Sequence, residues 1–239
     1  MKIGVKTYCN KIFLKHFDDK ADFFEVMALE GKDYSFLREF SKPIIIHAQH
    51  QLLGVNNADK TQRTKNISSL QFAISLANQN KSAKIIVHPG NIINKNCSKE
   101  ESISLINSFK DKRMLIENMP CPEEYLCTTP EEMSEYLKET GKGFCFDINH
   151  AISAALILKR DPFKMIKNFL KLKPSHYHLG GQKLTTNEEG QHLSFKDSKI
   201  DLDKIMKLIP KDAEITLETT TDIEKTEYDL DFIRKFTSK

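Results

Sequence analysis

The alternation of short β-branched runs with longer stretches of helical periodicity constrains the fold of this chain more than any other feature. Eight runs are predicted to be strands: Ile3–Lys6, Phe23–Leu29, Pro43–Ala48, Lys84–His88, Arg113–Asn118, Gly143–Ile148, Ser175–Leu179 and Glu214–Glu218. Helices are predicted at Thr61–Asn78, Ser98–Phe109, Pro130–Glu139, Ala151–Leu158, Asp161–Leu170, Leu202–Leu208 and Asp222–Phe236. Strands that alternate with helices build βαβ units around a parallel sheet.

Eight strands in 239 residues predict an α/β protein of the (β/α)8 TIM-barrel class, which typically needs about 250 residues. A doubly wound open sheet is the alternative. That fold normally carries a glycine-rich phosphate turn after an early strand, and the sequence has neither G-x-G-x-x-G nor a Walker A motif. Without a low-complexity linker or a charge block, we expect residues 1–239 to form a single TIM-barrel domain.

The amino-acid composition says more about the cellular compartment of the protein than about any reaction it catalyses. Hydrophobic residues make up 39% of the chain, yet no window approaches the roughly 18 apolar residues of a membrane span. The N-terminal residues lack the apolar core of a signal peptide and are predicted to form a strand. Five cysteines without a C-x-x-C pair indicate reduced thiols. We therefore expect a cytoplasmic protein with no membrane contact.

Charge gives little support to a dedicated nucleic-acid binder. The chain has 36 Lys and Arg residues against 33 Asp and Glu residues, and the net charge of +3 is spread along the sequence. Such binders more often carry a clustered basic patch.

Six predicted strands end in an ionisable residue, and this pattern is the main indication of function. The residues are His47, His88, Glu117, Asp147, His178 and Glu218, separated by 41, 29, 30, 31 and 40 positions. In a parallel barrel the carboxyl ends of all strands meet on one face, where the active sites of such barrels lie. Imidazole and carboxylate are ligands of zinc, manganese and iron. The pattern therefore predicts a metal site at this face.

A simpler interpretation exists for each residue taken alone. A histidine at a strand end is often a hydrogen-bonded structural residue, and an acidic residue there often caps the next helix. Six at equivalent positions are different, because carboxylates gathered at one mouth would repel each other without a cation. Since a mononuclear site uses about four protein ligands, six ligands indicate two metals that share a bridging carboxylate.

The motifs around these residues resemble the xylose isomerase-like TIM barrels, and most closely the endonuclease IV family, which cleaves DNA at abasic sites with zinc. The resemblance covers roughly residues 43–220. It rests on short motifs: His47-Ala-Gln-His-Gln-Leu-Leu-Gly54, His88-Pro-Gly90, Ile-Glu117-Asn118, Asp147-Ile-Asn-His150-Ala151, His178-Leu179 and Leu-Glu218-Thr219.

This resemblance implies a ligand set. His47, His88 and Glu117 would hold a first metal, and Glu117 would bridge to a second metal. The second metal would also be held by Asp147, His178 and Glu218. We expect two divalent ions, zinc in the first instance, with manganese or magnesium as alternatives.

A third metal of that family uses the histidine of Asp-x-x-His and an Asp-x-His pair. His150 and His192 are present, but the aspartate of the pair is missing, and Glu188 and Glu189 are the nearby substitutes. The resemblance therefore supports two metals more firmly than three.

Two enzymatic functions remain open on this basis. The first is hydrolysis of a phosphodiester or phosphoester, such as abasic-site DNA, with Glu117 and Glu218 as the catalytic carboxylates. The second is metal-dependent isomerisation or epimerisation of a sugar or sugar phosphate, in which the same two residues move a proton beside a carbonyl. A non-catalytic scaffold is a third class, which the complete ligand set disfavours.

The substrate would be a small phosphorylated or sugar molecule, or damaged DNA. His50, Asn118 and Lys183 are the candidate substrate-binding residues. The lean early loops favour a small molecule. Glu25, inside the second strand, is expected to be a paired core residue, and the sequence does not indicate protein partners or an oligomeric state.

Overall fold

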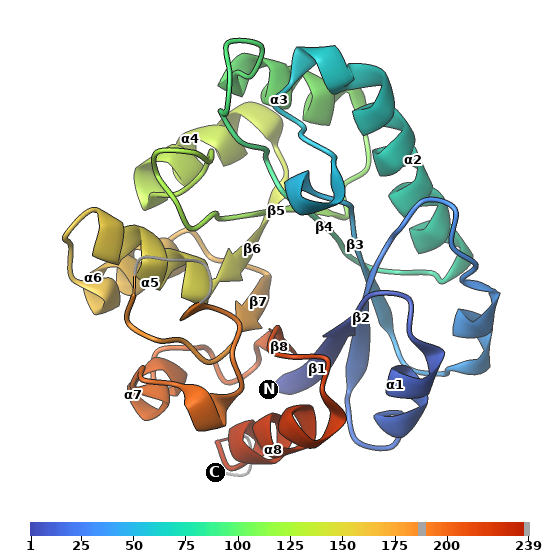
Figure 1. Ribbon diagram of the computed structural model, residues 1–239, viewed down its shortest axis with the longest axis vertical. Helices are drawn as coiled ribbons and strands as arrows, with labels where there is room; N and C mark the ends of the chain where they lie inside the picture. The colour runs from blue at the N-terminus through green and yellow to red at the C-terminus, as the bar shows by residue number, and fades with distance from the viewer. Residues whose placement is uncertain (186–189, 237–239) are drawn as a thin grey trace.

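The computed structural model describes residues 1–185 and 190–236, and it forms a closed barrel of parallel strands (Figure 1). The strands are β1 (Lys2–Thr7), β2 (Phe23–Met27), β3 (Ile44–His47), β4 (Ile85–Val87), β5 (Met114–Glu117), β6 (Gly143–Asp147), β7 (His176–Leu179) and β8 (Glu214–Leu217). Each strand pairs with the next in sequence, and β8 closes the barrel on β1. The TIM-barrel prediction is confirmed.

Helices surround the barrel on the outside (Figure 1). They are α1 (Lys11–His16), α2 (Arg63–Gln79), α3 (Lys99–Ser108), α4 (Pro130–Thr140), α5 (Ile148–Ile157), α6 (Pro162–Leu170), α7 (Leu202–Met206) and α8 (Ile223–Arg234). None of the helices that the structure describes is both long and apolar enough to cross a membrane.

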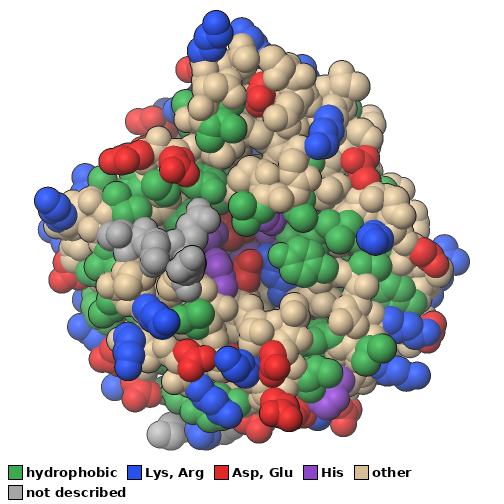
Figure 2. All heavy atoms as spheres, viewed as in Figure 1, with side chains coloured by type: hydrophobic (Ala, Val, Ile, Leu, Met, Phe, Trp, Pro, Cys, Tyr) green, Lys and Arg blue, Asp and Glu red, His purple; other side chains and the backbone are tan. Residues whose placement is uncertain are grey.

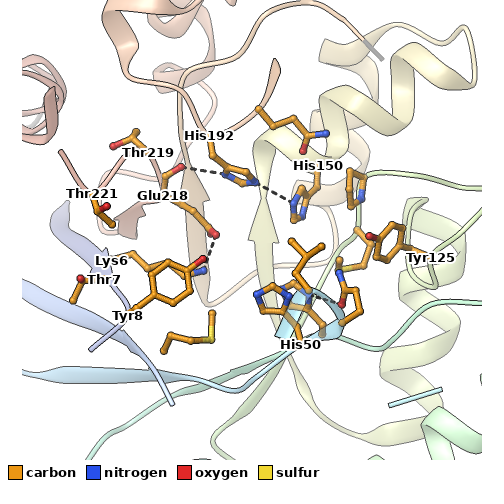
Figure 3. A pocket seen from close by; sticks show the side chains of 17 residues that line it. Lys6, Thr7, Tyr8, His50, Tyr125, His150, His192, Glu218, Thr219 and Thr221 are labelled. Atoms are coloured by element: carbon orange, nitrogen blue, oxygen red, sulfur yellow. Dashed lines mark hydrogen bonds and ion pairs between the residues drawn. The ribbon is translucent and has the colours of Figure 1, made fainter. Parts of the chain in front are cut away.

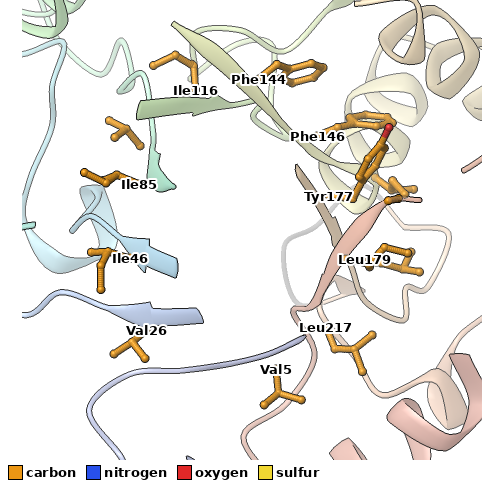
Figure 4. Packing of buried hydrophobic residues seen from close by; sticks show 14 of the residues in the cluster. Val5, Val26, Ile46, Ile85, Ile116, Phe144, Phe146, Tyr177, Leu179 and Leu217 are labelled. Atoms are coloured by element: carbon orange, nitrogen blue, oxygen red, sulfur yellow. The ribbon is translucent and has the colours of Figure 1, made fainter. Parts of the chain in front are cut away.

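The two faces of the strands have different chemistry, which places the functional residues. Outward-facing residues such as Val26, Ile46 and Phe146 belong to the large buried cluster between the barrel and the helices (Figure 4). Inward-facing residues form a separate cluster: Phe23, Ile45, Ile86, Leu115 and Cys145. Because side chains alternate along a strand, the residues two positions after these point into the barrel one layer closer to its mouth.

The helix starts follow the sequence signals, with one informative difference. The Ser98 hydroxyl accepts a hydrogen bond from the Glu101 backbone N–H, as the predicted capping signal requires. Helix α5, however, begins at Ile148, three residues before the predicted Ala151. The reason is that Asp147 both ends β6 and caps α5, since its Oδ1 accepts from the His150 N–H at 2.7 Å.

Several predicted boundaries were wrong by one or two residues. The predicted β2 extended to Leu29 but ends at Met27, and the predicted β3 began at Pro43 but begins at Ile44. The six-residue helix α1 was not predicted, because it is too short to show a helical period.

Candidate metal centre

The six predicted strand-end residues converge at the mouth of the barrel. Five of them are less than 8% exposed, and the Glu218 side chain is 20% exposed. The hollow in the centre of this face exposes histidine and acidic side chains (Figure 2). The strand alternation accounts for this convergence, because every one of the six points inward.

Glu117 lies at the centre of the cluster and presents its two carboxylate oxygens to different partners. Its Oε2 lies 3.3 Å from the His47 Nε2 and 3.1 Å from the His88 Nε2. Its Oε1 lies 3.2 Å from the His178 Nδ1. Although burial alone would raise the pKa of Glu117, the neighbouring imidazoles of His178 and His88 hold that pKa well below its usual value. The geometry thus places one carboxylate between two sets of candidate ligand atoms.

The second set of ligands lies on the Oε1 side of Glu117. The His178 Nδ1 is 2.7 Å from the Glu218 Oε2 and 3.9 Å from the Asp147 Oδ2. That Asp147 oxygen is buried and has no hydrogen-bond partner. Burial, together with the nearby carboxylates of Glu117 and Glu218, raises the pKa of Asp147 to about 7. A buried acceptor without a donor is a costly arrangement that a cation would relieve.

The tautomer of His47 supports the same conclusion. Its Nδ1 lies 2.8 Å from the Ala48 carbonyl oxygen, which can only accept, so Nδ1 carries the proton. In the neutral ring, the lone pair of Nε2 then faces the Glu117 carboxylate. Both groups would offer electron pairs to a metal between them. Two groups of possible ligands follow from this geometry, and within each group the donor atoms lie within 4.8 Å of one another. The groups are His47–His88–Glu117 and Glu117–Asp147–His178–Glu218. Their chemistry therefore fits two divalent ions.

His150 and His192 form a further pair above this centre (Figure 3). Their Nε2 atoms are 3.3 Å apart, and each Nδ1 faces a backbone carbonyl oxygen, that of Asn118 at 2.7 Å and that of Glu218 at 3.1 Å. Both Nε2 atoms therefore hold lone pairs in the neutral rings. Together with Asp147 they form a third group of possible ligands. Glu188 and Glu189 lie outside the described residues.

Two charged residues that sequence reasoning did not assign to the site lie within it. The Glu25 Oε2 is 3.0 Å from the His178 Nε2 and accepts from the Thr216 hydroxyl at 2.7 Å. Glu25 is thus paired and buried, as expected. The Lys6 Nζ donates to the Glu218 Oε1 at 2.6 Å and lies 3.5 Å from the Glu25 Oε1. The inward phase of β1 and β2 could have identified both.

The three candidate substrate-binding residues lie in different environments. His50 lines the cavity and stacks on His88, with ring centroids 4.5 Å apart. Asn118 is buried and bonds the backbone of Asp147 on both sides, donating to its carbonyl and accepting from its N–H at 2.8 Å each. It is therefore suited to holding Asp147 in place. Lys183 is exposed and does not line the cavity.

A cavity of about 340 Å³ opens at the candidate metal ligands His88, His150, His192 and Glu218, which line it (Figure 3). Its polar wall includes Lys6, His88, His150 and Glu218. Its apolar wall includes Tyr8, Met27, Leu52, Met119, Pro120 and Tyr125. The cavity is near the lower end of the roughly 300–1,000 Å³ that small-molecule sites occupy.

Comparisons with known proteins agree with this architecture. A family model described as xylose isomerase-like TIM barrel matches residues 35–236. No curated protein matches the sequence.

Three solved structures illustrate the likeness. A D-tagatose 3-epimerase-like protein superposes with a TM-score of 0.77 at 19% identity, covering 100% of this chain and 97% of that chain. Endonuclease IV from Thermus thermophilus gives a TM-score of 0.76 at 18% identity, covering 100% and 99%. The IolI protein with a bound zinc atom gives 0.70 at 15%, covering 99% and 96%. At these identities the likeness shows the fold alone.

Proposed function

This chain belongs to the xylose isomerase-like TIM barrel family and carries buried clusters suited to divalent metals, and we propose that it hydrolyses phosphoesters with two such ions. One observation carries the proposal: His47 and His88 approach one oxygen of Glu117 while His178 approaches the other. A mononuclear isomerase site would have no need of the two additional histidines.

In this proposal each candidate ligand has a distinct role. When bound, two divalent ions would activate a water molecule and offset the charge that develops on the phosphoryl group. Glu117 would bridge the two sites. His47 and His88 would complete one of them, and Asp147, His178 and Glu218 the other. Glu25 would orient His178 by accepting from its Nε2–H, which leaves Nδ1 free to bind.

Isomerisation or epimerisation of a sugar is the second candidate. Glu117, Asp147, His178 and Glu218 alone form a four-ligand group sufficient for one ion. Glu117 and Glu218 would then transfer a proton at the carbon beside the carbonyl. This second candidate leaves the close approach of His47 and His88 to Glu117 without a role.

An activity panel distinguishes the two candidates. Protein loaded with zinc, manganese or magnesium is assayed against p-nitrophenyl phosphate, bis(p-nitrophenyl) phosphate, an abasic-site duplex, and a set of aldoses, ketoses and their phosphates. We expect metal-dependent hydrolysis that His88→Ala and Glu117→Gln abolish. Interconversion of sugars by wild type and His88→Ala alike, without hydrolysis of any ester, would refute the proposal.

A further inference from the structure

Exposed hydrophobic side chains are concentrated around the mouth of the barrel. Among the described residues, seven large hydrophobic side chains are exposed, and five of these lie between the carboxyl end of a barrel strand and the next α-helix. We call these five the apolar rim: Tyr8 after β1, Leu52 after β3, Ile92 and Ile93 after β4, and Leu184 after β7. Leu52 is 75% exposed and Tyr8 is 49% exposed, and both line the cavity. Hydrophobic side chains border the hollow in Figure 2.

Cationic side chains are scarce at the same mouth. Of the described residues that line the cavity, Lys6 alone is a lysine or arginine, and its Nζ lies deep beside Glu218. Many other Lys and Arg side chains lie toward the outer edge of this face (Figure 2). A protein that grips a duplex neutralises several phosphates with Lys and Arg. The apolar rim offers no such contacts.

The floor of the cavity is nonetheless suited to an anion. Four carboxylates (Glu25, Glu117, Asp147 and Glu218) contribute four negative charges, and Lys6 contributes one positive charge. Two divalent ions add four positive charges, so the occupied centre carries a net charge of +1. Removing Lys6 would bring that net charge to zero.

From the apolar rim, the cavity size and this charge, and resting on the proposed function, we propose that the substrate is a small phosphate ester with an aromatic or apolar organic group. The phosphate would lie on the floor beside Lys6, and the organic group against Tyr8 and Leu52. In the reaction, the oxygen of a water molecule bonds to phosphorus and the bond from phosphorus to the ester oxygen breaks. The proton released by the water ends on the departing alcohol.

Binding of two phosphonates, which cannot be hydrolysed, tests the substrate class without activity. Isothermal titration of zinc-loaded protein compares phenylphosphonate with methylphosphonate. We expect phenylphosphonate to bind at least about tenfold more tightly, because its ring is removed from water against the rim. The double variant Tyr8→Ala/Leu52→Ala should reduce that ratio to below about threefold. Its matched control, Tyr228→Ala/Ile12→Ala, removes exposed side chains outside the cavity and should keep the ratio.

Variants of Lys6 test the anion contact. Lys6→Gln, checked for unchanged zinc content, should weaken both phosphonates by about tenfold while leaving their ratio intact, because it removes one charge from a water-poor site. Equal affinities of wild type for the two phosphonates would overturn the inference. So would cleavage of an abasic-site duplex in preference to phenyl phosphate. In both cases hydrolysis would still stand, whereas sugar conversion with no phosphonate binding would instead refute the proposed function.

Discussion

Glu117 is the residue on which the two candidate metal sites depend. Its carboxylate is fully buried, and each oxygen faces different imidazole nitrogens at 3.1–3.3 Å. A carboxylate buried this deeply needs compensating positive charge around it. Two cations would provide that charge and would also satisfy the lone pairs of the histidines, so this one side chain would couple both candidate sites.

Glu25 supports the centre from below, and its removal should weaken metal binding without unfolding the barrel. Its contact with the His178 Nε2 fixes the ring so that Nδ1 faces Glu117 and Glu218. Loss of such an outer partner typically costs about 10–100-fold in metal affinity. We expect Glu25→Gln to lower zinc affinity in this range, measured by competition with a chromophoric chelator.

The matched control for Glu25→Gln is Glu214→Gln. This carboxylate lies on β8 at the opposite end of the barrel, where it pairs with Lys84 and Lys2. Its replacement should leave zinc affinity unchanged. Equal affinities for wild type, Glu25→Gln and Glu214→Gln would show that Glu25 does not orient His178.

Among the elements, the loop after β4 depends on a glycine that brings two backbones together. Gly90 has a φ of +106°, and a Cβ there would lie 2.6 Å from the Ala58 nitrogen and 2.7 Å from the Asn56 Oδ1. We expect Gly90→Ala to lower the free energy of unfolding by about 2–3 kcal/mol through this clash and the backbone strain. Because His88 lies two residues away, zinc affinity should fall as well.

Gly31→Ala separates backbone strain from the clash. Gly31 also has a positive φ of +81°, but a Cβ there would meet nothing within 4 Å. Denaturant unfolding of this variant should show a loss of only about 1 kcal/mol, with no change in zinc affinity. Similar losses in the two variants would mean that the close approach at Gly90 relaxes at little cost.

Lys84 ties β4, β7 and β8 together at the end of the barrel opposite to the metal centre. Its Nζ donates to the Ser175 carbonyl and to the Glu214 Oε2, both at 2.6 Å. Although partial burial alone would raise the pKa of Glu214, the hydrogen bond from Lys84 holds that pKa below its usual value. Because the pKa of Glu214 is lowered in the folded protein, its ionised carboxylate stabilises the fold fully at pH values above the ordinary glutamate pKa of about 4.3. This stabilisation is lost as the pH falls through the lowered pKa.

Lys84→Met should therefore destabilise the protein by about 1 kcal/mol at pH 7, and by less in acid. Urea unfolding of wild type and variant at pH 7 and near pH 3 measures the difference. The exposed pair of Lys225 and Asp197 is the control, because Lys225→Met should change stability by less than about 0.5 kcal/mol. A deficit for Lys84→Met that is the same at both pH values would exclude the link to Glu214.

The alternation of strands and helices was sufficient to predict the barrel, and the ionisable residue at the end of six strands was sufficient to predict the convergence of six side chains. Lys6 and Glu25 were not assigned to the site, although the inward phase of β1 and β2 places both inside the barrel; their partners, Glu218 and His178, depend on which strands face each other across it. The start of α5 was missed because Asp147 serves as strand end, cap and candidate ligand at once. Exposure of Leu52 and Tyr8 follows from loop packing, which the sequence pattern does not encode.

At the scale of the whole molecule, three layers of different side-chain chemistry follow one another along the barrel axis. The apolar cluster of Phe23, Ile45, Ile86, Leu115 and Cys145 fills the lower interior. The polar layer above it gathers donors from β3 to β8, so each metal would link strands that are distant in sequence. The apolar rim follows the carboxyl ends of β1, β3, β4 and β7, and its Tyr8 and Leu52 line the cavity. A chain with this layout can vary its substrate through the loops while keeping the metal centre intact.

The number of metal ions per chain tests the central claim most directly. Protein purified without chelator, or reconstituted with zinc and freed of excess ions, is measured by elemental analysis beside His88→Ala and Glu117→Gln. The two ligand sets that share Glu117 predict two or more zinc ions in wild type. They predict one ion fewer in His88→Ala, and a loss from both sites in Glu117→Gln. A wild-type chain that holds a single ion, retained undiminished by His88→Ala, would contradict the two-metal centre.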